Sequence, residues 1–157
     1  MNTEEITRIL KPLLTNSRAR FLGVFASEKL PPLKTIQSLI PCCYVSKIDR
    51  TWKGGSKWVD FFHSKPIRFE FFDSNGRQPC EFGFSFPTSL QIFQNPYQIQ
   101  AFGTQVCCHF CIYILYHLAH HYALNSIYNR FSILLYVRSA SIVSSFIRNA
   151  HERINKK

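Results

Sequence analysis

The most apolar stretch of the chain, residues 106–124, predicts a long helix that begins near Cys107. The stretch contains four histidines: His109, His117, His120 and His121. Imidazole groups are costly in the hydrocarbon of a bilayer, so this helix is not expected to span a membrane. We expect it to pack in the core of a globular domain instead.

Upstream of this helix, short apolar or aromatic-rich segments predict strands. These segments are residues 21–25, 42–48, 58–63 and 67–72. The last of them stops at Asp73-Ser74-Asn75-Gly76, which is typical of a tight turn. Residues 49–56 contain Gly54-Gly55 and are expected to form a turn, whereas residues 79–96 are expected to be irregular.

Two further helices are expected near the ends of the chain. The first dozen residues carry apolar side chains at helical spacing, with Thr3 as the N-cap and Pro12 as the residue that ends or bends the helix. A closing helix is expected over about residues 129–153. Few strands flanked by helices predict an α+β domain with a small mixed sheet.

Composition restricts the chain to a globular protein. It has 157 residues, of which 46% are hydrophobic and 15% aromatic. This apolar content excludes wholesale disorder. A domain usually has about 100–200 residues, so we expect residues 1–157 to form a single domain.

The net charge and the cysteine spacing predict the kind of binding partner and the cellular compartment of the protein. Nineteen Lys and Arg against nine Asp and Glu give a net charge of +10, which favours polyanionic partners such as nucleic acid. The acidic, polar first residues do not resemble a secretory signal, and the six cysteines lack the spacing of a disulfide framework. We therefore expect a reduced, intracellular protein.

The chemistry is concentrated where the long helix begins. A thiol at a helix N-terminus is a candidate nucleophile, because the helix dipole stabilises its thiolate, and Cys107 occupies this place. Gln100 precedes it across a turn that contains Gly103, and its NH2 group can point at a developing oxyanion. Asp73 ends a strand and can orient a base. The residues alone do not identify that base.

These segments together resemble the adenovirus-type (adenain-like) cysteine proteases, most closely those encoded by Maverick/Polinton-like transposons and related viruses. Residues 21–25 resemble the first strand of that family, Phe72-Asp73-Ser74 its strand end, and Gln100 and Cys107 keep its spacing. The resemblance covers most of the chain. It implies a papain-like fold and peptide-bond hydrolysis, with Cys107 as the nucleophile, Gln100 as the oxyanion donor and Asp73 as the group that orients an imidazole.

The chain departs from the family at the catalytic histidine, because Lys57 stands immediately before Trp58, where the family has His. A Lys with a pKa of about 10.4 is a poor proton shuttle at neutral pH. His63, further along the expected strand, would lie roughly 20 Å away. We therefore expect impaired peptidase activity. Cys108 is a second departure, since the family usually has Gly after the nucleophile.

Other interpretations remain open. Cys108 and Cys111, with His117 or His120, form only half of a zinc-site pattern, and no metal or other cofactor is expected. The expected partner is a polypeptide substrate or, in a non-catalytic descendant of the protease, a protein or DNA held through charge. The resemblance makes DNA relevant because adenovirus-type proteases are activated by it, and it favours the nucleus or a virion as the location.

Overall fold

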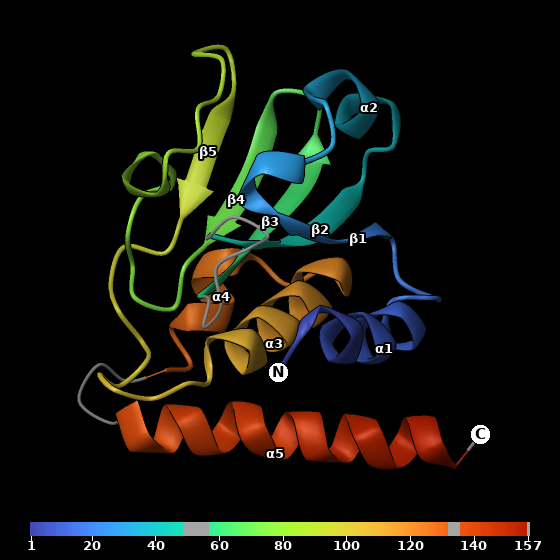
Figure 1. Ribbon diagram of the computed structural model, residues 1–157, viewed down its shortest axis with the longest axis vertical. Helices are drawn as coiled ribbons and strands as arrows, with labels where there is room; N and C mark the ends of the chain where they lie inside the picture. The colour runs from blue at the N-terminus through green and yellow to red at the C-terminus, as the bar shows by residue number, and fades with distance from the viewer. Residues whose placement is uncertain (49–56, 132–135, 157) are drawn as a thin grey trace.

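The computed structural model describes residues 1–48, 57–131 and 136–156 and shows a mixed α+β fold, which confirms the expected class (Figure 1). The strands are β1 Arg20–Ala26, β2 Cys42–Lys47, β3 Trp58–Lys65, β4 Arg68–Phe72 and β5 Gln91–Gln94. The helices are α1 Thr3–Leu13, α2 Leu33–Ser38, α3 Cys107–Ala119, α4 Leu124–Tyr128 and α5 Tyr136–Asn155, with short 3-10 turns at η1 Ser27–Lys29 and η2 Pro79–Phe82.

The five strands form one mixed sheet in the order β1-β2-β3-β4-β5. The two outer pairs, β1 with β2 and β4 with β5, are parallel, and the inner pairs are antiparallel. In the centre of the sheet Val45 pairs with Asp60, and Phe61 pairs with Phe71. This register places the start of β3 beside the end of β2 and the end of β4.

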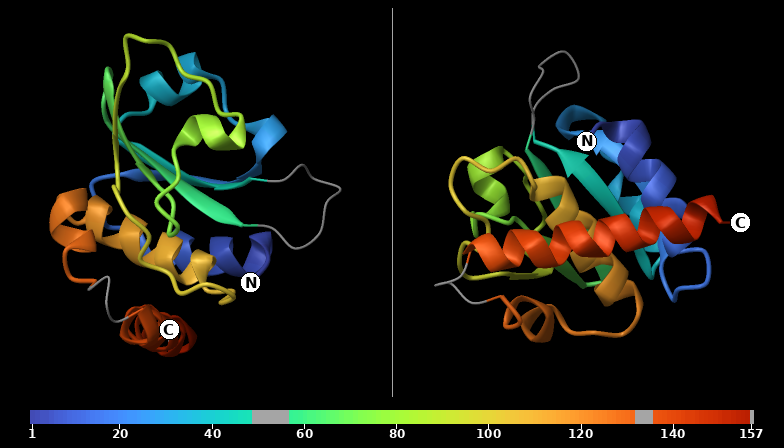
Figure 2. Two further views of the ribbon diagram at one scale, coloured as in Figure 1. Left: turned by 90° about the vertical axis from the view of Figure 1, so that its left-hand side faces the viewer. Right: turned by 90° about the horizontal axis from the view of Figure 1, so that it is seen from below.

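Side chains alternate along each strand, so apolar side chains lie on both faces of the sheet. Other elements cover each of these faces. On one face Trp58 and Phe62 belong to a core shared with α1 and α3, which lie beneath the sheet, and α5 packs against α1 and α3 as a further layer (Figures 1 and 2). On the other face Tyr44, Phe61 and Phe69 form a second core with α2 and the segment after η2. The predicted long helix is α3, and most of its residues are buried.

The first helix differs from expectation at its cap. Asn2, not Thr3, is the N-cap: its side chain accepts a hydrogen bond from the Glu5 N–H at 2.9 Å, and Glu5 accepts one from the Asn2 N–H at 2.8 Å. This reciprocal pair satisfies two N–H groups at once, which a cap at Thr3 would leave unpaired. Pro12 lies inside the last turn, and the helix ends at Leu13 as expected.

Two other expectations are corrected. Residues 79–96 are not wholly irregular, because β5 lies within them and pairs with β4. The closing helix does not run from residue 129, since α4 ends at Tyr128 and α5 begins at Tyr136. The turn expected at residues 49–56 lies outside the described residues. Among the described residues, no helix is both long and apolar enough to cross a bilayer.

Candidate active site

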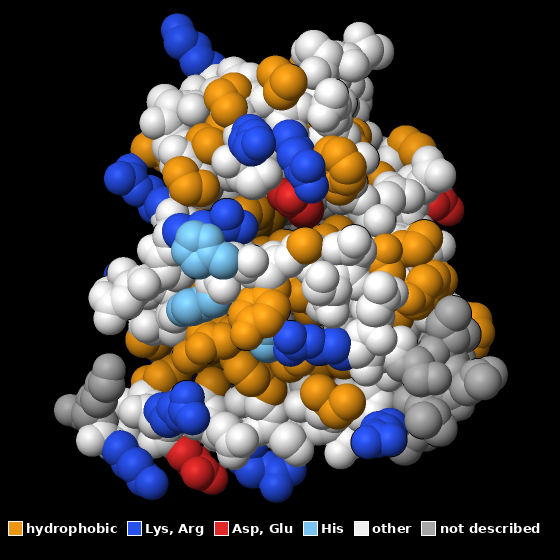
Figure 3. Space-filling view, turned by 180° about the vertical axis from the view of Figure 1, so that it is seen from behind, with side chains coloured by type: hydrophobic (Ala, Val, Ile, Leu, Met, Phe, Trp, Pro, Cys, Tyr) orange, Lys and Arg blue, Asp and Glu red, His pale blue; other side chains and the backbone are white. Residues whose placement is uncertain are grey.

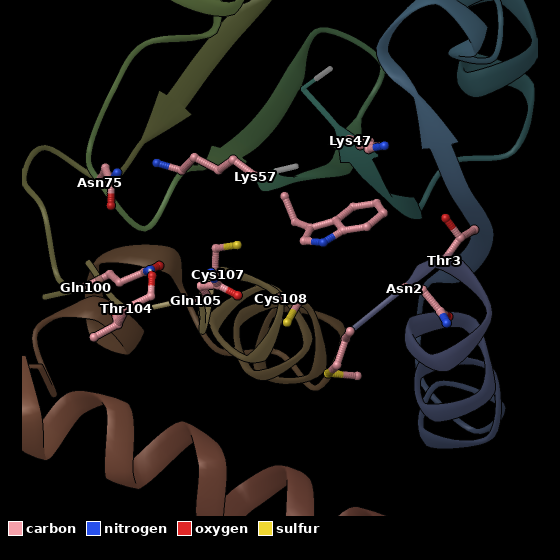
Figure 4. A pocket seen from close by; sticks show the side chains of 12 residues that line it. Asn2, Thr3, Lys47, Lys57, Asn75, Gln100, Thr104, Gln105, Cys107 and Cys108 are labelled. Carbon is pink, nitrogen blue, oxygen red and sulfur yellow. The ribbon is translucent and has the colours of Figure 1, made fainter. Parts of the chain in front are cut away.

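A cavity of about 470 Å³ opens where α3 begins, beneath the end of β2 and the start of β3 (Figure 4). Three of the four residues selected from the sequence line it, namely Lys57, Gln100 and Cys107. The fourth, Asp73, is fully buried behind Lys57. The other described residues that line it are Met1, Asn2, Thr3, Lys47, Trp58, Asn75, Thr104, Gln105 and Cys108.

Cys107 is the first residue of α3, as predicted, and its side chain is partly exposed to the cavity. Val106 precedes the helix as its N-cap and supplies no side-chain cap. In the first turn the His109 N–H donates to the Val106 carbonyl at 2.9 Å, and the partial positive charge of this end of the helix is directed at the region around Cys107.

The Asp73 carboxylate binds two side chains and two backbone groups. One oxygen lies 2.5 Å from Lys57 Nζ and accepts a 3.2 Å hydrogen bond from the Asn75 N–H. The other lies 3.5 Å from Arg77 Nε and accepts a 3.0 Å hydrogen bond from the Arg77 N–H. Asn95 holds the backbone of Asp73, donating to its carbonyl and accepting from its N–H. The carboxylate is therefore fixed in place at the end of β4.

Lys57 occupies the position between this carboxylate and the cavity, with 14% of its side chain exposed. Burial lowers the pKa of its ammonium group, and the neighbouring Asp73 carboxylate opposes that shift without cancelling it. A thiolate at Cys107 would also act on Lys57 by favouring its charged form. The cavity therefore borders an ammonium group that is paired with a buried carboxylate.

Gln100 is held from both ends of its amide. The Ser74 hydroxyl donates to its Oε1 at 2.6 Å, and its Nε2 donates to the Thr104 carbonyl at 2.6 Å. The amide NH2 has two hydrogens, so one remains to be donated to a group bound in the cavity. The Thr104 contact fixes which end of the amide carries these donors, because a carbonyl oxygen can only accept a hydrogen bond.

None of the six histidines, all of which are described, lines this cavity. His63 lies on the opposite face of the sheet, where its Nε2 is 3.4 Å from Tyr44 Oη. His109 points toward α5, where its Nδ1 lies 3.1 Å from Ser144 Oγ. No histidine side chain therefore lines the cavity that Lys57 and Cys107 share.

The described residues contain no group of three or more His, Cys, Asp or Glu side chains arranged to hold a metal ion. Cys108 and Cys111 are both buried in α3. His117 is bound instead at its Nδ1 to the Tyr113 carbonyl, at 2.8 Å.

Sequence reasoning missed several residues that hold this site together. Ser74 and Thr104 orient Gln100, and Arg77 and Asn95 fix Asp73. The Asp-Ser-Asn-Gly turn was a usable signal for Ser74, since a residue that follows the acid at a strand end lies beside it. Asn95 had no such signal, because it is brought to Asp73 only by the pairing of β4 with β5.

Comparison of the chain with protein-family models finds no match, and comparison with curated proteins finds no significant relative.

Proposed function

We propose that this chain is an adenovirus/Polinton-like cysteine endopeptidase domain with a papain-like arrangement, in which Lys57 in the histidine position impairs peptide-bond hydrolysis. The observation that supports this proposal is the ion pair between Lys57 and Asp73 beside the cavity that Cys107 lines. The residue at the family's histidine position, Lys57, is in contact with the residue at its acid position, Asp73. Lys57 and Asp73 are 16 residues apart in the sequence, and they make the contact that the family's histidine and acid would make.

Each retained group has a role in such a reaction. The Cys107 thiolate attacks the peptide carbonyl, and the Gln100 NH2 together with the Cys107 N–H stabilises the oxyanion that forms. The leaving amine then needs a proton. Lys57 is paired with Asp73, so giving up its proton leaves the buried carboxylate without its nearest counter-charge. Proton transfer is therefore the impaired step.

Replacing Lys57 with histidine tests this proposal. A general acid–base typically contributes about 10²–10⁴ in rate, so Lys57→His should raise the rate of peptide cleavage by about that factor. Cleavage of a peptide library and labelling by an electrophilic, thiol-directed probe are the measurements. Lys47→His is the matched control, because Lys47 lines the same cavity away from Asp73. A double variant, Lys57→His with Cys107→Ser, should be inactive because it lacks the nucleophile. If the original chain cleaves as fast as Lys57→His, the argument about the base is wrong.

A second candidate function is a non-catalytic module that binds a protein or DNA. A hollow of about 490 Å³ between the end of α1 and the start of β1 favours the DNA version. Lys11, Arg18 and Arg20 line it, together with the hydroxyl side chains of Thr15 and Ser17, and none of its described lining residues is acidic. Such a lining suits a phosphate group.

A further inference from the structure

A second nucleophilic side chain shares the cavity with Cys107, because Lys57 contributes a primary amine to its lining. Figure 4 shows Lys57 above Cys107, which projects from the first turn of α3 toward the strands. Among the described residues, the other lysine that lines the cavity is Lys47, which the same view places farther from Cys107. An acyl group carried by Cys107 would therefore face the Lys57 amine.

A thioester differs from a peptide bond in the group that leaves. The amine that leaves a peptide bond must take up a proton as the bond breaks. No histidine lines the described part of the cavity to supply that proton. The thiol that leaves a thioester has a pKa of about 8.5, so it departs as a thiolate without a proton donor. Attack of Cys107 on a thioester therefore avoids the step that Lys57 impairs.

The acyl group formed on Cys107 has two possible acceptors, water and the Lys57 amine. Water must lose a proton as it attacks, and the cavity offers no imidazole to take it. Burial lowers the pKa of Lys57, which increases the neutral share of its amine at a given pH. A well-oriented group in the same site reacts as if its concentration were about 10⁵–10⁸ M, which outweighs a small neutral share. The amine is thus the favoured acceptor.

The buried carboxylate beside Lys57 keeps other partners when the ammonium charge is lost. Asp73 lies 3.5 Å from Arg77 Nε and accepts hydrogen bonds from the Arg77 and Asn75 N–H groups at 3.0 and 3.2 Å. These contacts do not involve Lys57, so they remain when its amine becomes a neutral amide. Conversion of Lys57 therefore leaves Asp73 with one cation and two N–H donors.

We propose that Cys107 takes an acyl group from a thioester and passes it to Lys57 Nζ, where it remains as an amide. The inference rests on one part of the proposed function, the role of Cys107 as nucleophile, and goes beyond peptide cleavage. The chain would modify itself once, at a residue that then carries no charge.

The reaction has two steps. The Cys107 thiolate attacks the thioester carbonyl, the C–S bond of the donor breaks, and the donor thiolate leaves with the electron pair. The neutral Lys57 amine then attacks the carbonyl carbon on Cys107, the new C–S bond breaks, and Cys107 leaves as a thiolate while the nitrogen gives one proton to water. The spare N–H of Gln100 can donate to the carbonyl oxygen in both steps. A thioester and an amine thus become an amide and a thiol, with no change of oxidation state.

Incubation of the whole chain with the N-acetylglycyl thioester of mercaptoethanesulfonate, followed by peptide mapping, tests this proposal. We expect one acyl group on Lys57 that hydroxylamine does not remove. Lys57→Arg keeps a cation beside Asp73 and should hold the acyl group on Cys107, where hydroxylamine releases it. Cys107→Ala should acylate Lys57 at least about a hundred times more slowly. Lys47→Arg is the matched control and should be acylated on Lys57 at the original rate.

The possible failures are distinguishable. Equal acylation of Lys57 in Cys107→Ala would mean that the amine reacts directly with the donor, which overturns the proposal. An acyl group that stays on Cys107 of the original chain until water removes it also overturns the proposal, yet it supports Cys107 as the nucleophile of the proposed function. A chain that gains no acyl group on either residue would contradict both.

Discussion

Two aspartates of this chain illustrate how surroundings decide what one residue type does. Asp73 is buried with Lys57, Arg77 and two backbone N–H groups around its carboxylate, so its charge is compensated and it acts as a fixed support. Asp60 is equally buried and lacks such partners among the described residues. A buried carboxylate without compensation favours its neutral form, so burial raises the pKa of Asp60 well above its usual range.

His63 gives a prediction about stability at acid pH. It lies between the rings of Tyr44 and Phe69, with centroids 5.7 and 4.8 Å away, and burial lowers its pKa from 6.5 to about 4. The unfolded chain therefore takes up this proton at a higher pH than the folded one. The stability that neutral His63 gives the folded chain is therefore complete above about pH 6.5. As pH falls toward 4 this stability is lost, which lowers the free energy of unfolding by roughly 3 kcal/mol.

His63→Phe keeps a ring in this stack and removes the titration. The difference in free energy of unfolding between the original chain and His63→Phe should fall by about 2 kcal/mol between pH 7.5 and pH 5, measured by urea denaturation. His121→Asn is the control, because His121 is exposed and its φ of 72° is one that asparagine tolerates. A difference that does not change with pH would mean that His63 takes up its proton at the same pH in the folded and the unfolded chain.

Among the structural elements, the turn after β4 does most to hold the candidate site. Gly76 closes it, donating a 2.8 Å hydrogen bond to the Asp73 carbonyl with a φ of 71°. A Cβ at this position would lie 2.5 Å from the carbonyl carbon of Tyr97. Gly76→Ala should therefore lose about 1 kcal/mol to the left-handed conformation and a further 1–3 kcal/mol, roughly, to the clash.

Gly83→Ala separates these two effects. Gly83 has a similar φ of 78°, but a Cβ there would meet no atom within 4 Å. Its alanine variant should lose only the conformational part, which urea denaturation of both variants measures. Equal losses for the two variants would show that the backbone of Tyr97 moves aside and that the turn does not constrain the position of Asp73.

The elements that sequence could predict are those whose signals are local. The start of α3 at Cys107 and the inner strands follow from runs of apolar residues that turn residues bound. The cap at Asn2 was also predictable, because Asn2 and Glu5 have capping-box spacing. Strand β5 was not, since its exposed residues carry no apolar alternation and only its pairing with β4 makes it a strand.

The candidate site likewise combines features that have a local signal in the sequence with features that depend on long-range pairing. Cys107 was predictable from its place at a helix start, and three of the four selected side chains line one cavity. The pairing of Lys57 with Asp73 depends on the register that places β3 beside β4. The burial of Asp60 depends on how α3 crosses that sheet, which no local pattern encodes.

For the molecule as a whole, the remaining question is where its net charge of +10 acts. Figure 3 shows Lys and Arg side chains at several separate places on one face, with histidine and hydrophobic side chains among them. Such scattered charge attracts polyanions weakly and without a preferred orientation. Lys11, Arg18 and Arg20 line the hollow between α1 and β1, and the Arg18 guanidinium is held there by two hydrogen bonds to the Leu118 carbonyl.

If duplex DNA binds at this hollow, its affinity should depend steeply on salt. Three phosphate contacts give a slope of about −2.7 in log–log form, so raising salt from about 50 to about 200 mM should weaken binding roughly forty-fold. Lys11→Gln with Arg20→Gln should make the slope shallower by about 1.8, as fluorescence anisotropy with a random-sequence duplex would measure. Lys29→Gln with Lys34→Gln removes the same charge from exposed residues elsewhere and should preserve the slope. Association that is insensitive to salt, or equal weakening by the two double variants, would mean that this hollow is not a phosphate site.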